Sequence, residues 1–165
     1  MTGRTRARPP PGRTEEGSDM GVTRCAVVGL EGVVALAGVG GGAAMMADPR
    51  EAMGLSPSML DRLPVRTWFV PGAALVACNG ILPAAVAVAE LRGRRWPRRG
   101  GHVVAGLVLL SWPVGETVLF GYPLAGEPRW LRPAVAATGV VVTCLGVVLR
   151  QAEDGEPSGD GGAQR

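Results

Sequence analysis

The sequence predicts an all-α protein: an integral membrane bundle of four transmembrane helices, with a short outer-surface helix between spans one and two. Three observations predict it. Four long apolar blocks approach the roughly 20 residues that a helix needs to cross a bilayer, at about 25–47, 67–90, 102–122 and 131–149. Arginine is concentrated in alternate segments between these blocks, and aromatic residues lie near block ends. A soluble chain of 165 residues rarely contains four such runs, because its helices alternate polar and apolar faces.

The arginine distribution predicts the orientation. All 17 cationic residues are arginine, and 12 of them lie in the N-terminal segment, the linker LRGRRWPRRG and the C-terminal segment. Positive charge collects on the cytoplasmic side of membrane proteins. We therefore expect a multi-pass protein of the plasma membrane with both termini cytoplasmic. Position explains the net charge of +3, so the sequence favours contact with the lipid bilayer and no nucleic-acid partner.

The chain divides into three parts. Residues 1–20 and 151–165 are rich in Gly, Pro and charge, which predicts a disordered basic tail and a disordered acidic tail, both cytoplasmic. Residues 21–150 form the predicted transmembrane domain. Met20 is an alternative start of the chain. The first apolar block is longer than the core of a cleaved signal peptide, so we expect it to remain as span one.

Small residues and prolines shape the predicted spans. Gly38 and Gly42 form a small-xxx-small step in span one, a pattern that lets helix backbones approach closely in lipid. Pro71, Pro83 and Pro113 are expected to kink spans two and three. Membrane-interface anchors are expected near the outer ends of spans two to four, at Trp68, Tyr122 and Trp130.

The outer loop from Asp48 to Arg66 contains the segment LSPSMLDRLPV, which predicts a short helix. Ser56 would be its N-cap and Pro57 its first residue, and the helix would end before Pro64. Its apolar residues would share one face, namely Leu55, Met59, Leu60 and Leu63. This helix is interpreted as a packed cap over the bundle, with a ligand-gating lid as the alternative.

Three polar residues inside the predicted spans are the candidate site residues: Glu31, Asn79 and Glu116. Helical rise places Glu31 about 10 Å from the inner boundary, Glu116 about 9 Å from the outer boundary, and Asn79 near the midplane. A staggered series of this kind suits interhelical hydrogen bonding, a proton or ion pathway, or a site for a small ligand such as a quinone. Whether Glu31 or Glu116 ionises is left open.

Other chemistry is not indicated. No catalytic residue, metal ligand set or cofactor site is predicted. The single histidine, His102, offers too little material for a His-based metal site or a catalytic triad. The glycine-rich GVGGGAA lacks the lysine of a phosphate-binding loop and falls within a span. The three cysteines lie in predicted spans, so no disulfide framework is expected.

Several short motifs resemble a known group of proteins. They are Ala47-Asp48-Pro49, Gly54-Leu55, Val70-Pro71-Gly72, Asn79-Gly80, Arg95-Trp96, and Trp130-Leu131 with Pro133. Over about 25–149 the chain resembles uncharacterised small actinobacterial membrane proteins with four helices, DoxX-like in outline. The resemblance implies the four-helix bundle and no established activity. It also implies an amide at the position of Glu116, so Glu116 is interpreted as a neutral acid that replaces glutamine.

The function predicted from these features is that of an accessory or structural membrane component, with a membrane-protein partner or a second copy of the chain. One alternative is a small transporter or proton-linked carrier that uses Glu31, Asn79 and Glu116. A second alternative is the membrane subunit of a quinone-linked oxidoreductase. Enzymatic activity is not expected, although the sequence does not decide it.

Overall fold

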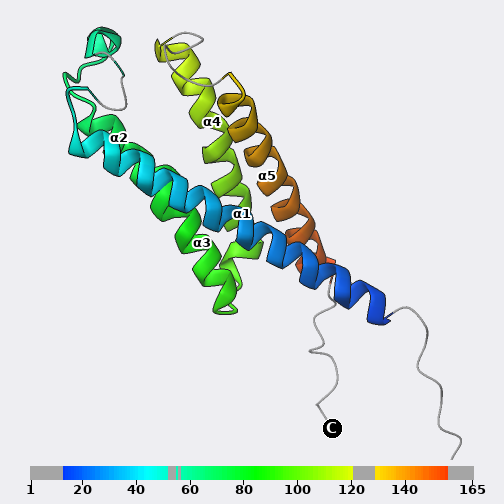
Figure 1. The fold of residues 1–165 in the computed structure, drawn as a ribbon. Helices are drawn as coiled ribbons and strands as arrows, with labels where there is room; N and C mark the ends of the chain where they lie inside the picture. The colour runs from blue at the N-terminus through cyan, green and yellow to red at the C-terminus, as the bar shows by residue number, and fades with distance from the viewer. Residues whose placement is uncertain (1–12, 52–54, 56, 121–128, 156–165) are drawn as a thin grey trace, which may run out of the picture.

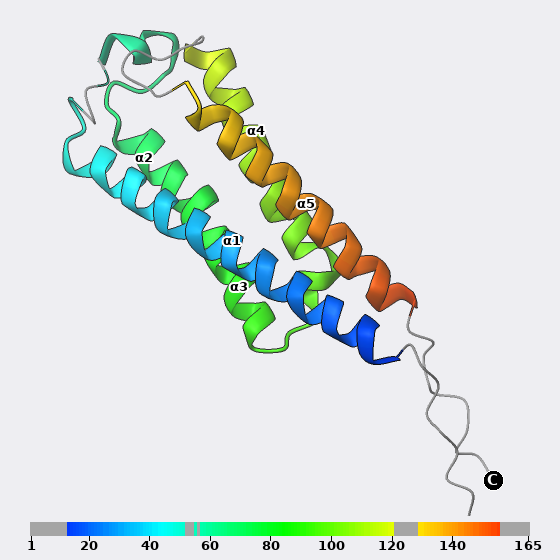
Figure 2. The ribbon, with the colours of Figure 1, turned by 45° about the vertical axis from the view of Figure 1, so that its right-hand side comes forward.

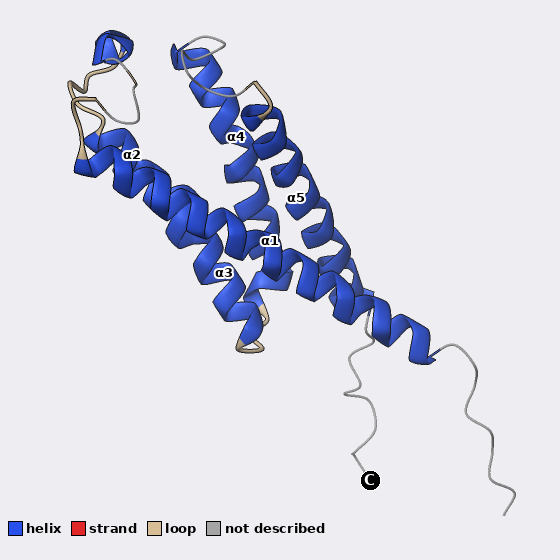
Figure 3. Ribbon diagram, viewed as in Figure 1, coloured by secondary structure: helices blue, strands red, loops and turns tan. Residues whose placement is uncertain are grey.

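A computed structural model describes residues 13–51, 55, 57–120 and 129–155 of the chain. These residues are mostly helical, with short loops between the helices (Figure 3). The elements in chain order are α1 (Arg13–Ala47), η2 (Pro57–Arg62), α2 (Phe69–Leu75), η3 (Val76–Ile81), α3 (Leu82–Leu91), η4 (Pro97–Gly101), α4 (His102–Phe120) and α5 (Leu131–Gly155).

Within the described residues, four helical stretches are long and apolar enough to cross a membrane: Asp19–Ala47, Phe69–Leu91, Pro97–Leu119 and Leu131–Gly155. Large apolar side chains on them face outward, such as Leu36 at 77% exposed and Val118 at 74%. Several polar side chains face inward instead: Glu31, Asn79, Glu90, His102 and Arg132. This arrangement suits a lipid surround, so the predicted class, an all-α multi-pass membrane protein, is confirmed by helix length and hydropathy.

The helices pack as two groups (Figures 1 and 2). Helix α1 runs beside the continuous stretch α2–η3–α3, and α4 runs beside α5. Arg13, where α1 begins, and Gly155, where α5 ends, lie at the same end of the bundle as the 92–99 hairpin that joins α3 to α4. Arg24 contacts Glu90 beside this hairpin, and we call this end the basic end. The opposite end holds η2 and is called the cap end.

Glycines set the closest contacts between α1 and its neighbours. A Cβ atom added to Gly38 would lie 2.5 Å from the carbonyl carbon of Asn79, and one added to Gly42 would lie 2.5 Å from the carbonyl oxygen of Gly72. Such distances are too short for real side chains, so both positions need glycine. The small-xxx-small step of span one therefore packs within the same chain, against α2 and η3.

A second set of glycines joins α4 to α5. A Cβ on Gly139 would lie 2.8 Å from the backbone nitrogen of Leu110, and one on Gly106 would lie 2.6 Å from that of Thr143. A Cβ on Gly146 would lie 2.8 Å from the Cβ of His102. These contacts are not predicted from the sequence, because the three glycines lack the four-residue step that marks Gly38 and Gly42.

Span two contains a widened turn, η3, just before Pro83. The backbone N–H of Leu82 donates to the carbonyl of Ala77, five residues earlier, as in a π-helix. Proline has no N–H and crowds the carbonyl four residues before it, which here belongs to Asn79. The π-helical turn opens the backbone at this position, where the sequence predicts a kink.

The first and last helices extend beyond their predicted spans. Helix α1 begins at Arg13, inside the segment predicted as disordered, and α5 continues to Gly155. Packing explains part of the extension, because Met20 contacts a cluster at the basic end that contains Val27, Val142 and Leu149. Residues 1–12 and 156–165 of the predicted tails lie outside the described residues.

The loop helix forms a packed cap. The predicted short helix is a 3-10 helix, η2, and it buries Leu60 at 1% exposed against Met45 and Trp68. Leu55, Met59 and Leu63 pack on this cluster, as their shared face predicts. Ser56, the predicted N-cap, lies outside the described residues.

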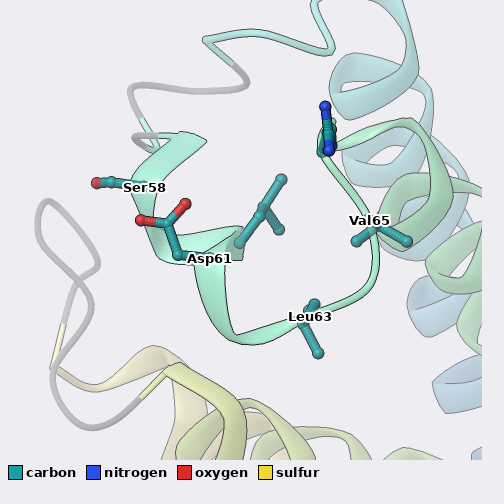
Figure 4. Close-up of a pocket in the computed structure, with 6 residues that line it drawn as sticks. Ser58, Asp61, Leu63 and Val65 are labelled. Atoms are coloured by element: carbon teal, nitrogen blue, oxygen red, sulfur yellow. The ribbon is translucent and has the colours of Figure 1, made fainter.

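The cap encloses a shallow hollow (Figure 4), lined by Ser58, Leu60, Asp61, Leu63, Val65 and Arg66. Ser58 and Asp61 point to the same side of the turn, and Leu63 and Val65 lie on the loop that leads to α2. The hollow belongs to the cap itself, so it gives no support to a lid over a ligand site between the helices.

Candidate functional site

Ionisable side chains from four helical elements and one hairpin meet at the basic end. Helix α1 supplies Arg24 and Glu31, the last turn of α3 supplies Glu90, and α4 begins with His102. Arg98, in the part of the hairpin that belongs to η4, and Glu153 of α5 complete the set. Glu31 and Glu90 are each 1% exposed, and His102 is fully buried. Burial of this kind is costly unless each group has a partner, so the contacts decide what the site can do.

His102 lies between the two buried carboxylates. Its Nδ1 is 2.8 Å from Oε1 of Glu31, a hydrogen bond that joins α4 to α1 across 71 residues of sequence. Its Nε2 is 3.7 Å from Oε2 of Glu90, which is an electrostatic contact and too long for a hydrogen bond. The imidazole therefore connects two acids that come from different helices.

Glu90 is held by two arginines. Arg24 Nε donates to Oε1 of Glu90 at 2.6 Å, and Arg98 Nε donates to both carboxylate oxygens at 3.0 and 3.1 Å. Arg98 also donates from Nη1 to Glu153 Oε1 at 3.0 Å, which links the hairpin to α5. Hydrogen bonds between charged groups are the stronger ones, so Glu90 is the centre of the network.

The charges of this network balance around one proton. The six residues supply three carboxyl groups, two guanidinium groups and one imidazole. Arginine keeps its charge inside proteins, so the network is neutral when one proton is shared between His102 and Glu31. Removal of that proton leaves one net negative charge in a buried position.

Two fully buried side-chain atoms of the network have no hydrogen-bond partner among the described residues: Oε2 of Glu31 and Nε2 of His102. Both belong to the Glu31–His102 pair. An unsatisfied buried nitrogen and oxygen can accept or donate to a water molecule if one enters. The Glu31–His102 pair is therefore the part of the network where buried atoms can still form new hydrogen bonds.

Glu116 belongs to a separate polar group in the cap half of the bundle. Trp112 Nε1 donates to Glu116 Oε1 at 2.8 Å within α4, and Arg132 Nε of α5 lies 3.8 Å from Glu116 Oε2. Arg132 also donates from Nη1 to the Thr117 hydroxyl at 3.2 Å, and it is only 5% exposed. A buried guanidinium is costly without a compensating group nearby, and the Glu116 carboxyl is one such group beside Arg132.

Asn79 is the third candidate from the sequence. It is 4% exposed within η3, and neither its Nδ2 nor its Oδ1 has a hydrogen-bond partner among the described residues. Its backbone carbonyl is the surface on which Gly38 packs. Asn79 therefore lies at the closest approach of α1 to span two, where a side-chain amide without a protein partner is unusual.

The three predicted residues do not form one site. Glu31 bonds to His102, whereas Glu116 lies 14 residues further along α4, or about 21 Å at helical rise. Asn79 bonds to neither. The partners that complete the basic-end network were not selected from the sequence: Glu90, His102, Arg24, Arg98 and Glu153. A signal existed, because Glu90 ends an apolar run and His102 begins the next, so a short hairpin must place them at the same end.

The predicted interface anchors lie in different environments. Trp130 is 67% exposed at the start of α5, a position that suits an anchor. Trp68 is 2% exposed within the cap cluster, so its ring packs against Leu60 and Met45 rather than facing the membrane. Tyr122 lies outside the described residues.

In the part of the chain that the structure describes, no group of His, Cys, Asp and Glu is arranged to hold a metal ion.

Comparison with known proteins adds no family. The chain matches no known protein family, no curated protein and no solved structure. The DoxX-like resemblance and the actinobacterial origin therefore remain without support, and the protein is defined by its fold: four helices of membrane-span length.

Proposed function

We propose that this protein is an accessory or structural component of the plasma membrane, held as one rigid unit by the ion network at its basic end. The observation that carries the proposal is that Glu90, Arg98 and His102 tie together four helical elements. Closed ion networks between helices fix their relative positions, which suits a protein whose role is to present a surface.

The proposed orientation places both termini and the basic end in the cytoplasm. Two single-cysteine proteins test it, made after Cys25, Cys78 and Cys144 are replaced by serine. Glu51→Cys lies in the exposed cap loop, and Arg94→Cys lies in the exposed hairpin. A membrane-impermeant maleimide should label Glu51→Cys on intact cells and Arg94→Cys only after permeabilisation. The reverse pattern overturns the orientation.

The accessory role is tested by purification in mild detergent from native membranes, with quantitative mass spectrometry of the proteins that co-elute. A membrane protein recovered in a fixed ratio supports the role. Recovery of the chain alone, at the same yield after crosslinking in intact cells, counts against it. The same purification is repeated with Glu90→Gln, which breaks the network and should lose the co-eluting protein. Glu51→Gln is the matched control and should keep it, because Glu51 is exposed and outside the network.

A second function, a proton-linked carrier, is favoured by one specific observation. His102 faces Glu31 from α1 and Glu90 from α3, and the His102–Glu31 pair retains two unbonded atoms. Beyond Glu90 lie Arg24, which is 42% exposed, and Arg98, which is 22% exposed. A proton on the pair would therefore be close to water at the basic end.

Vesicles that contain the purified protein and a pH-sensitive dye distinguish this second function. A carrier gives a proton flux in response to a pH step, and Glu31→Gln removes the flux because the amide cannot release a proton. Glu51→Gln should keep it. A proton flux no greater than that of empty vesicles would contradict the carrier function and favour a structural role for the network.

A further inference from the structure

The hairpin that joins α3 to α4, residues 92–99, carries more positive charge than the network uses. Five arginines lie in these eight residues, and only Arg98 is engaged in the network. The other four are exposed: Arg92, Arg94, Arg95 and Arg99. None of these four forms an ion pair with any residue in the described part of the chain.

The hairpin is held in shape by its own backbone. Gly93 takes a positive φ of 69°, which ends α3 and reverses the chain. The N–H of Arg94 donates to the carbonyl of Ala89 at 2.9 Å, and that of Arg99 donates to the carbonyl of Arg95 at 3.2 Å. The four guanidinium groups are thus attached to a fixed turn rather than to a loose linker.

Trp96 lies among these arginines with part of its ring against the protein. A Cβ on Gly101 would lie 2.6 Å from Cζ3 of Trp96, so the absence of a side chain at Gly101 makes room for the ring. The residue nevertheless remains 48% exposed. An indole that is half packed and half exposed at the end of a membrane helix is typical of the headgroup region.

The acidic groups near the hairpin do not neutralise it. Glu90 bonds to Arg24 and Arg98, Glu153 bonds to Arg98, and Asp154 faces Arg150 at 3.8 Å. Within the described residues, the hairpin therefore presents an excess of four positive charges beside a half-exposed tryptophan. Guanidinium groups bind phosphate oxygens in a bidentate manner, and anionic lipids offer such phosphates at this depth.

We propose that the 92–99 hairpin is a binding site for the phosphate headgroups of anionic phospholipids. Arg92, Arg94, Arg95 and Arg99 contact the phosphates, and the Trp96 indole lies at the level of the headgroups. The proposal does not depend on the accessory role or on proton transport, since the hairpin arginines involved take no part in the ion network.

The test uses the full-length protein in nanodiscs of phosphatidylcholine with a minor share of phosphatidylglycerol. Native mass spectrometry after release from the discs counts the lipids retained by the protein. The wild type should retain phosphatidylglycerol well above its share of the disc. Arg94→Gln/Arg95→Gln should weaken this retention about 10- to 30-fold, from the electrostatic attraction that each cation contributes near an anionic surface.

Two matched variants define the site. Arg50→Gln/Arg66→Gln removes the same charge at the cap end, where both residues are exposed, and should retain the wild-type preference. Arg94→Lys/Arg95→Lys keeps the charge without the bidentate fork, and should retain part of the preference. Equal retention in the wild type and Arg94→Gln/Arg95→Gln, or equal loss in the cap-end control, overturns the proposal.

The same discs identify the source of the anion. Inorganic phosphate at tens of millimolar should not displace phosphatidylglycerol, because free phosphate lacks the acyl chains that place the lipid beside Trp96. A short single-stranded oligonucleotide is the other competitor. If it binds the protein in phosphatidylcholine discs through Arg94 and Arg95 and displaces phosphatidylglycerol, the hairpin is a nucleic-acid site and the lipid proposal is wrong.

Discussion

The basic end and the cap end hold neighbouring segments together by different means. At the basic end, the most deeply buried side chains include the ionisable residues Glu31, Glu90 and His102. At the cap end, the side chains buried to the same degree are apolar, Leu60 and Trp68. The loop that carries Leu60 lies between the predicted spans and packs on the ends of two of them, at Met45 and Trp68. Water is present beside this loop, so burial of apolar surface is favourable there. Between helices in lipid that driving force is absent, so close backbones and polar contacts must supply the attraction.

The substitution with the largest expected effect is Glu90→Gln, at the centre of the network. Glu90→Gln leaves the guanidinium groups of Arg24 and Arg98 without their anion. Breaking a buried ion pair costs about 3–5 kcal/mol, and we expect the low end, about 3 kcal/mol, because the two arginines are 42% and 22% exposed. We expect a clearly lower thermal unfolding midpoint in detergent, measured by circular dichroism. Glu51→Gln is the control. Equal midpoints for the two variants would mean that the network does not hold the helices.

The corresponding change at the cap end is Leu60→Ala. Loss of a buried leucine costs about 2–5 kcal/mol, because it removes apolar contacts and leaves a cavity beside Met45 and Trp68. We expect the effect to be local: faster proteolysis of the 48–66 loop, with the unfolding midpoint of the helices nearly unchanged. Phe69→Ala, at a position 51% exposed, should leave proteolysis unaltered. A large drop of the midpoint in Leu60→Ala would show that the cap also stabilises the spans.

Between the two ends, Gly38→Ala tests how much the close backbone contact between α1 and η3 stabilises the protein. The added methyl group would collide with the backbone of Asn79, and overpacking of this kind costs about 1–3 kcal/mol. Gly40→Ala is a matched control two residues away, where an added Cβ meets no atom within 4 Å. The unfolding midpoint should fall in the first variant and stay level or rise in the second. Similar midpoints would place the helix contact elsewhere.

The smallest expected effect concerns Glu116. Glutamine keeps the hydrogen bond from Trp112 but removes the charge that faces Arg132, which we expect to cost about 1 kcal/mol. Leucine removes both interactions and should lower the midpoint further. Thermal unfolding of the two variants in the same detergent gives the comparison. If glutamine leaves the protein unchanged while leucine does not, Glu116 acts through hydrogen bonding alone and its charge is dispensable.

One residue of the basic-end network, Glu31, is predictable from the sequence, whereas its partners are not. Glu31 was selected because an acid within an apolar run is expensive, a property that a single segment reveals. Its partner His102 is a single histidine, which by itself indicates no metal site or triad, and Glu90 is the last residue of the apolar block 67–90. Their contacts connect residues 71 and 66 positions apart, from Glu31 to His102 and from Arg24 to Glu90. No local pattern records such a pairing.

The sequence by itself determined the four apolar helices, their approximate limits and the need for glycine at Gly38 and Gly42. These follow from local rules, because in lipid each segment must satisfy its own backbone hydrogen bonds and small residues mark close approach. Only the tertiary structure decided that Glu31, Glu90 and His102 form one network while Glu116 pairs with Arg132. The rotation and axial shift of each helix against the others choose which polar side chains meet, and those two quantities arise from the packing of all four helices together.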